Sequence, residues 1–183
     1  MCATASTCGS SATSATLGRT ITIMSLPQAI ADYWARFNSE VGGVESTRLY
    51  EHFYFGDNER LANDLAELVL VGTKRATANL VWSFEAAKQR VRVPGDLRIV
   101  TDWNGKPMCA IETTKVEIVP FGEVTDEFAA IEGEGDGTLK YWVWGHTNYF
   151  KRECTRLNQD FSKDMLVACE QFKVVFPSSK GAA

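Results

Sequence analysis

The sequence predicts an α+β fold, in which a small β-barrel of mostly antiparallel strands is flanked by helices. Three observations support this prediction. Apolar residues recur at helical spacing near the start, period-two alternation with turn signals fills the centre, and a strand-like run closes the chain. The 183 residues fit one domain, and a hydrophobic fraction of 45% supplies a sizeable core.

The two ends of the chain differ from its middle. Residues 1–24 are dominated by Ala, Ser and Thr, contain no acid and carry one basic residue, Arg19. Such a segment cannot bury a core, and it lacks the charged start and long apolar run of a secretory signal. We expect a disordered tail or extended start at residues 1–24, with an organelle transit peptide as the second interpretation. The domain then covers residues 25–177, and residues 178–183 form a C-terminal tail.

Two helices are expected at the start of the domain. Ser25 can cap the first helix, with Pro27 near its first turn. Its apolar face consists of Ile30, Tyr33, Trp34 and Phe37. The second helix begins near Asn58 and ends at Gly72, because glycine is the common residue just past a helix. Its apolar face consists of Leu61, Leu65, Leu68 and Val69.

Strands and two further helices complete the domain. After a Pro94-Gly95 turn, the hairpin signal Asn104-Gly105 predicts that residues 98–103 pair antiparallel with residues 108–119. A short helix and a longer helix follow, and a last strand at residues 168–176 closes the domain. The longer helix carries one apolar stripe, made of Leu139, Trp142, His146, Tyr149 and Phe150.

The charge distribution argues against a protein that coats nucleic acid nonspecifically. The formal net charge is −4 and the pI is near 5.3, whereas such binding needs many cations at phosphates. A local basic patch remains, downstream of the Lys74-Arg75 pair, and consists of Lys88, Arg90, Arg92 and Arg98. Two interpretations stay open: a solvated helix end and strand face, or a cluster that binds phosphates.

Cysteine and histidine usage sets the expected chemistry and compartment. The five cysteines lack the close spacing of a zinc site or a redox motif, which favours a reducing, cytoplasmic setting. With only His52 and His146 in the chain, we expect neither a metal nor another cofactor. No apolar run has the length needed to span a membrane.

The stretch "VGTKRATA" places Gly72, Lys74 and Thr77 where a helix passes into a strand. Two interpretations fit, a solvated bend or a reacting pair. A threonine hydroxyl is a weak nucleophile that needs a neighbouring base, and a partly desolvated lysine can lose its proton near neutral pH. Lys74 would then be the base for Thr77, with a carboxylate to orient the amine or protonate the leaving group.

The stretch "EGEGDG" at residues 132–137 alternates acids with glycines. A calcium loop starting at Glu132 needs an acidic ligand at its twelfth position, where this chain has Val143. A solvated acidic loop, with Asp136 or Thr138 capping the next helix, is one interpretation. The other is that glycines bring the Glu132 carboxylate close to another backbone segment.

Two residues of the longer helix are candidates for contact with a ligand. His146 lies on the apolar stripe, so a core histidine competes with a substrate-binding one. Trp144 lies off that stripe and is therefore the better candidate for stacking on a nucleobase.

Together these motifs resemble those of ASCH-domain proteins of the compact bacterial type. The resemblance covers roughly residues 27–176 and rests on the order of "GTKRAT", "PGD", "CAIETTKVEIVPF", "FAAIEGEGDGTLKYW" and "CEQFKVVF". It implies a barrel related to the PUA-like RNA-binding domains. It also implies action on RNA or a modified nucleoside, as an amidohydrolase that deacetylates 4-acetylcytidine, as a non-catalytic RNA-binding module, or as a ribonuclease.

The resemblance also implies roles for individual residues. The reacting set of the amidohydrolase-like members falls on Lys74, Thr77 and Glu132. Arg75 follows the lysine and is expected to face the same cleft. The basic patch and the longer helix add Arg92, Trp144 and His146 to Arg75 as the expected substrate-binding residues. Amide hydrolysis on a modified pyrimidine nucleoside is the leading hypothesis.

Overall fold

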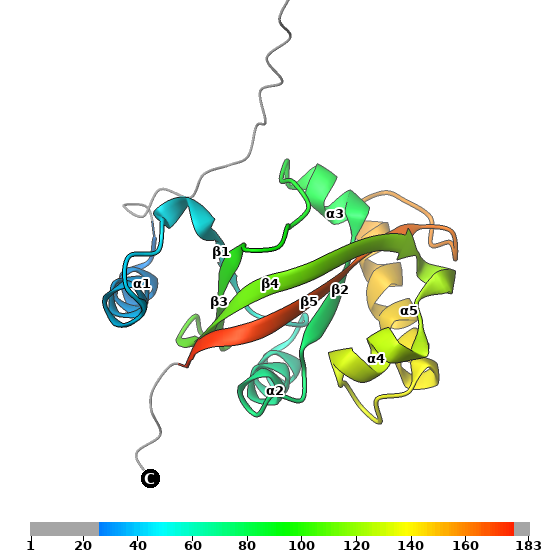
Figure 1. Ribbon diagram of the computed structural model, residues 1–183. Coiled ribbons are helices and arrows are strands. Elements are labelled where there is room, and N and C mark those ends of the chain that lie inside the picture. The colour runs from blue at the N-terminus through cyan, green and yellow to red at the C-terminus, as the bar shows by residue number, and fades with distance from the viewer. Residues whose placement is uncertain (1–25, 178–183) are drawn as a thin grey trace, which may run out of the picture.

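The structure is a computed structural model that describes residues 26–177. Both expected tails and the expected helix cap Ser25 lie outside the described residues. Within them, five strands and five α-helices form an α+β domain, as the sequence predicts (Figure 1). Two short 3-10 turns, Ser46–Arg48 and Phe121–Glu123, join these elements.

One sheet runs through the domain in the order β1-β3-β4-β5-β2. The strands are β1 Leu49–Phe53, β2 Ala76–Leu80, β3 Leu97–Thr101, β4 Pro107–Pro120 and β5 Leu166–Pro177. β1 and β3 pair in parallel, and the other three pairings are antiparallel. The predicted hairpin is confirmed, because β3 and β4 pair antiparallel across Asn104-Gly105, where Gly105 has φ 83°.

The sheet is not closed, so the predicted barrel is wrong. β1 and β2 are the two edge strands and do not pair with each other. The end of β1 and the middle of β2 instead line one cavity, together with charged side chains from β3 and the loop before it. If β1 and β2 paired to close the barrel, these polar side chains would be buried without partners. Burying polar groups without hydrogen-bond partners is energetically costly.

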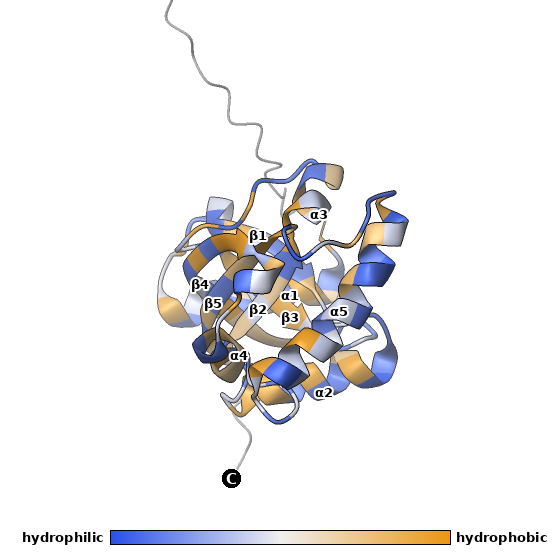
Figure 2. Cartoon of the chain, turned by 90° about the vertical axis from the view of Figure 1, so that its right-hand side faces the viewer, coloured by the Kyte–Doolittle hydropathy of each residue, from blue (hydrophilic) through white to orange (hydrophobic). Residues whose placement is uncertain are grey.

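Helices cover both faces of the sheet. They are α1 Gln28–Val41, α2 Glu59–Leu70, α3 Val81–Ala86, α4 Asp126–Glu132 and α5 Leu139–Arg156. The short helix α3 was not predicted. Asn58 caps α2 by accepting a hydrogen bond from the Leu61 backbone N–H, and Thr138 caps α5 in the same way at Tyr141. Polar and apolar residues alternate along α2 and α5, as amphipathic helices require (Figure 2).

Three apolar clusters hold the helices to the sheet. The predicted face of α1 is buried against β1, β3 and the end of β5. The face of α2 packs on β3, β4 and β5 through Leu65 and Val69, whereas Leu61 is 36% exposed and does not belong to it. Trp142 and Phe150 of α5 pack with α4 on β2 and β5. The lysine motif and the acidic loop therefore lie between two well-packed units.

Candidate active site

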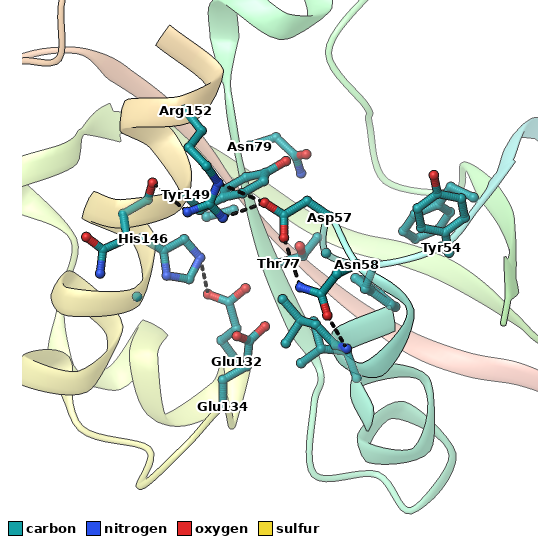
Figure 3. A pocket seen from close by; sticks show the side chains of 18 of the residues that line it. Tyr54, Asp57, Asn58, Thr77, Asn79, Glu132, Glu134, His146, Tyr149 and Arg152 are labelled. Atoms are coloured by element: carbon teal, nitrogen blue, oxygen red, sulfur yellow. Dashed lines mark hydrogen bonds and ion pairs between the residues drawn. The ribbon is translucent and has the colours of Figure 1, made fainter. Parts of the chain in front are cut away.

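A cavity of about 700 Å³ opens between α5, β2 and the segment that follows β1. Residues 53–58 form one wall, and Thr77 and Asn79 contribute from β2. Glu132 and Glu134 lie below, opposite His146 and Tyr149 of α5 (Figure 3). Three segments far apart in the sequence therefore meet here.

The turn after α2 places Lys74 inside the protein. Gly72, with φ 78°, lets the chain reverse, and its N–H donates to the Val69 carbonyl. The N–H groups of Thr73 and Lys74 both donate to the Leu68 carbonyl, at 2.9 and 3.0 Å. The last carbonyls of the helix are thereby satisfied, and Lys74 turns inward until only 1% of it is exposed. The predicted solvated bend is excluded for this lysine.

Two carboxylates hold the Lys74 ammonium. Its Nζ lies 2.9 Å from Glu132 Oε1 and 2.6 Å from Glu134 Oε1. It also lies 5.2 Å from the centre of the Phe55 ring, which lines the cavity. Burial alone would lower the pKa of Lys74, but the two carboxylates offset burial and raise that pKa above its ordinary value. Lys74 is therefore a cation in the free protein.

Glu132 is held on all sides. It is 1% exposed, and its Oε2 accepts a hydrogen bond from the Trp142 indole N–H and lies 3.6 Å from His146 Nε2. Burial alone would raise the pKa of Glu132, but Lys74 and His146 together hold it below its ordinary value. The imidazole of His146 stacks on the Trp142 ring at 4.0 Å between centres. Glu132 is thus a fixed carboxylate.

Glycine lets the acidic loop approach the lysine turn, as one of the two interpretations predicted. Gly133 has φ 69°, and a Cβ at this position would lie 2.3 Å from the Thr73 carbonyl oxygen. The Arg75 N–H donates to the Ile131 carbonyl at 3.0 Å, and this hydrogen bond also joins the lysine turn to the end of α4. The other interpretation also holds in part, because Asp136 and Thr138 pair at the start of α5.

Thr77 lies on β2 and lines the cavity with 8% of its surface exposed. Its cross-strand partner in β5 is Glu170, so the two side chains emerge on the same face of the sheet, about 5 Å apart at Cβ. Lys74 lies in the turn before β2, which begins at Ala76. The alternation of side chains along the strand therefore does not decide whether Lys74 and Thr77 point to the same side.

A second group of buried charges lies beyond Thr77. Arg98 on β3 contacts Glu170 at 2.6 Å, and Glu170 also accepts from the Thr113 hydroxyl. Arg92 lies 2.5 Å from Glu51 and 3.4 Å from Glu170. Burial and the nearby Arg92 lower the pKa of Arg98 to about 10. We call Arg92, Arg98, Glu51 and Glu170 the arginine cluster.

The expected substrate-binding residues divide into two groups. Arg92, Trp144 and His146 line the cavity, whereas Arg75 is exposed and is not among the lining residues. Trp144 is 64% exposed and packs on Tyr141 at 5.6 Å between ring centres, so it stands at the cavity rim.

Two residues, Glu134 and the buried Arg98, were missed as site candidates. The sequence offered a signal for Glu134, which stands two positions after Glu132 in the same glycine-rich stretch. Arg98 was noted only as part of a basic patch. Its partners are Glu51 on β1 and Glu170 on β5, and no local sequence pattern predicts these contacts.

The basic patch is largely neutralised. Arg90 makes a two-point contact with Asp96, at 2.6 and 2.7 Å, and Arg92 is buried against its own carboxylates. Lys88 is exposed and adopts φ 54°. The patch is therefore mostly internal ion pairs and not a row of free cations.

The chain belongs to the ASCH domain family, whose model matches residues 51–176. A solved ASCH domain from Lactobacillus crispatus is 36% identical, covers 83% of this chain and 97% of its own, and superposes with a TM-score of 0.77. A protein from Enterococcus faecalis is 31% identical, covers 82% of this chain and 90% of its own, and gives a TM-score of 0.75. A search of curated protein sequences finds no match.

Two further observations bear on the class of site. Across residues 26–177, the structure groups no three His, Cys, Asp or Glu side chains in a way that could hold a metal ion. In the same range, no helix combines the length and apolar character needed to cross a bilayer.

Proposed function

We propose that this ASCH domain hydrolyses an amide on a modified pyrimidine nucleoside, of the 4-acetylcytidine type, with Thr77 as nucleophile. One observation carries the proposal: a fully buried lysine is shared by two carboxylates that line a cavity, and Thr77 lines the same cavity. Buried lysine–carboxylate groups beside a cavity are typical of acid–base chemistry.

The raised pKa of Lys74 defines how the set would work. A lysine that is charged at rest becomes a base only after its proton passes to a carboxylate partner. The neutral amine then removes the Thr77 proton as the hydroxyl attacks the acetyl carbonyl. Glu132, fixed by Trp142 and His146, keeps the amine aimed at that point. Trp144 at the rim would stack on the base, and Arg92 would support the far wall.

RNA binding without catalysis is the second candidate, and ribonuclease action is its catalytic variant. The family is RNA-associated, and the exposed Trp144 beside Tyr141 offers a stacking surface. Against a long RNA stands the neutralised basic patch, since counterion release needs cations that are free to meet phosphates. A small, uncharged substrate therefore fits the site better.

A screen with three separable outcomes tests the proposal. The purified protein is incubated with 4-acetylcytidine and, separately, with a mixed RNA. Released acetate supports the amidohydrolase, cleaved RNA supports the ribonuclease, and retained but intact RNA supports a binding module. If long RNA is the partner, affinity falls steeply with salt and on replacement of Lys88, Arg90 or Arg92.

Threonine variants test the nucleophile. Thr77→Ser keeps a hydroxyl and is expected to retain more acetate release than Thr77→Ala, which removes it. Equal rates for the two variants would rule out Thr77 as the attacking group. Circular dichroism of each variant confirms that the comparison is between folded proteins.

A further inference from the structure

The two carboxylates that share Lys74 are not equivalent. Glu132 is 1% exposed and both its oxygens are engaged, Oε1 by Lys74 and Oε2 by Trp142. Both glutamates line the cavity, but the side chain of Glu134 is 23% exposed and meets Lys74 through Oε1 alone. Within residues 26–177, no donor reaches its second oxygen. One carboxylate is therefore locked, and the other is open to the ligand.

This difference matters because a proton that leaves Lys74 needs somewhere to go. A proton on Glu132 would be enclosed by Lys74, Trp142 and His146. A proton on Glu134 would sit at the cavity surface, 2.6 Å from the amine that released it. The shorter contact and the greater exposure both favour Glu134.

We infer that Glu134 is a further catalytic residue, the general acid–base that takes a proton from Lys74 and delivers it to the leaving nitrogen. The inference rests on the proposed amide hydrolysis. In it, Glu132 is a positioning residue that holds Lys74 and does not exchange its own proton.

The proposed reaction transfers the acetyl group to Thr77 and returns Lys74 and Glu134 to their resting charges. The Lys74 ammonium passes a proton to Glu134, and the resulting amine accepts the Thr77 hydroxyl proton while the threonine oxygen bonds to the acetyl carbon. The carbon–nitrogen bond then breaks, and the Glu134 proton moves to the departing nitrogen. This leaves free cytidine, an acetyl ester on Thr77, a charged Lys74 and an ionised Glu134. Water cleaves the ester by the same route and releases acetate.

The loop geometry supports this division of roles. Gly133 separates the two glutamates and holds a left-handed conformation against Thr73. Gly135, with φ 60°, lies against the Tyr141 ring, where a Cβ would come within 2.1 Å of a ring carbon. The backbone of Glu134 therefore lies between two glycines that close contacts constrain, and its carboxylate is positioned by the Lys74 ammonium.

The test compares Glu134→Gln with Glu132→Gln, and uses Glu123→Gln, an exposed residue outside the cavity lining, as the matched control. Each variant is assayed with 4-acetylcytidine and with p-nitrophenyl acetate, whose leaving group needs no proton. For Glu134→Gln we expect kcat on 4-acetylcytidine to fall about 100-fold with KM little changed, and a far smaller loss on the activated ester. Glu132→Gln is expected to lose both activities, and Glu123→Gln neither.

A second measurement does not depend on turnover. Hydrogen exchange of the Lys74 ammonium with water, followed by nitrogen-15 NMR, is expected to slow in Glu134→Gln if Glu134 is the exit for its proton. An active wild type with an equally active Glu134→Gln would overturn the inference alone. An inactive wild type would refute the proposed hydrolysis and, with it, the catalytic role of Glu134. If exchange is nevertheless slower in Glu134→Gln, the only part of the inference that stands is that Glu134 accepts the Lys74 proton.

Discussion

The cavity separates two groups of buried charges that are built in opposite ways. On one side a single lysine faces two glutamates, so the group carries an excess of negative charge. On the other side the arginine cluster matches two cations with two anions. The balanced group has no net charge at rest, although Arg98 Nε and Nη1 have no hydrogen-bond partner within the described residues. The unbalanced group has room for a proton or for the positive edge of a ligand.

The elements that carry the two groups differ as well. Glu51, Arg98 and Glu170 belong to paired strands, where each backbone is fixed by its neighbours. Lys74 and Glu134 lie on turns that glycines shape. Arginine also keeps its proton in proteins, whereas lysine can give it up. In the proposed mechanism, the arginine cluster therefore builds the cavity wall and the lysine group performs the acid–base chemistry.

The largest expected effect breaks the lysine side of this comparison. Lys74→Arg keeps the charge but cannot act as a base, so we expect it to lose acetate release nearly as completely as Lys74→Met, by about 100-fold or more. Turnover of 4-acetylcytidine measures both. A phosphate-binding lysine predicts a different order, with Lys74→Arg close to the wild type, and that order would refute the base assignment.

A large stability effect is expected on the arginine side. Arg98→Met leaves Glu170, 1% exposed, without its closest cation, and breaking a buried pair costs about 3–5 kcal/mol. Urea unfolding measures the loss. Arg156→Met removes an exposed pair with Glu153 and serves as the control, with an expected cost below about 1 kcal/mol. If Arg98→Met lost as little unfolding free energy as Arg156→Met, the predicted stabilising role of Arg98 would be wrong.

A smaller effect is expected at the glycine between the two glutamates. Gly133→Ala meets the Thr73 carbonyl and must keep φ 69°, so we expect a loss of about 1–3 kcal/mol in unfolding free energy and weakened catalysis. Gly137→Ala is the matched control, since Gly137 has φ 72° but nothing within 4 Å of an added Cβ. Equal losses would show that the approach to Thr73 is unimportant.

The smallest effect concerns acid stability. Lys74 and His146 hold the pKa of Glu132 below its ordinary value of 4.5 despite burial. This carboxylate therefore contributes stability above about pH 4.5, and the contribution is lost as the pH falls through the lower folded value. Urea unfolding at about pH 6 and pH 3.5 should show a steeper decline for the wild type than for Glu132→Gln. Parallel declines would contradict the assignment.

The sequence predicted elements better than it predicted closure. The helix ends at Asn58 and Gly72 and the turn at Asn104-Gly105 follow from local backbone chemistry, which needs no knowledge of distant segments. Barrel closure depends on whether the two edge strands pair. In this protein β1 and β2 do not pair, and residues of both strands line the cavity.

The site shows the same division between local and distant information. Lys74, Thr77 and Glu132 were selected because their motifs stand out, and the structure brings Lys74 into contact with Glu132. The arginine cluster was missed because Arg92 and Glu170 lie 78 residues apart in the chain. The basic patch that the sequence predicts consists largely of ion pairs in the structure. Sequence spacing does not show which carboxylate each guanidinium contacts.

Trp142 gives the protein a built-in optical reporter. Its indole donates to Glu132 and stacks on His146, so the electronic surroundings of one chromophore register both the charge of the carboxylate and the position of the imidazole. A ligand that draws a proton through the lysine group alters those surroundings without touching the ring. The part of the tryptophan emission that Trp142 contributes would therefore follow events in the cavity in real time and without an added label.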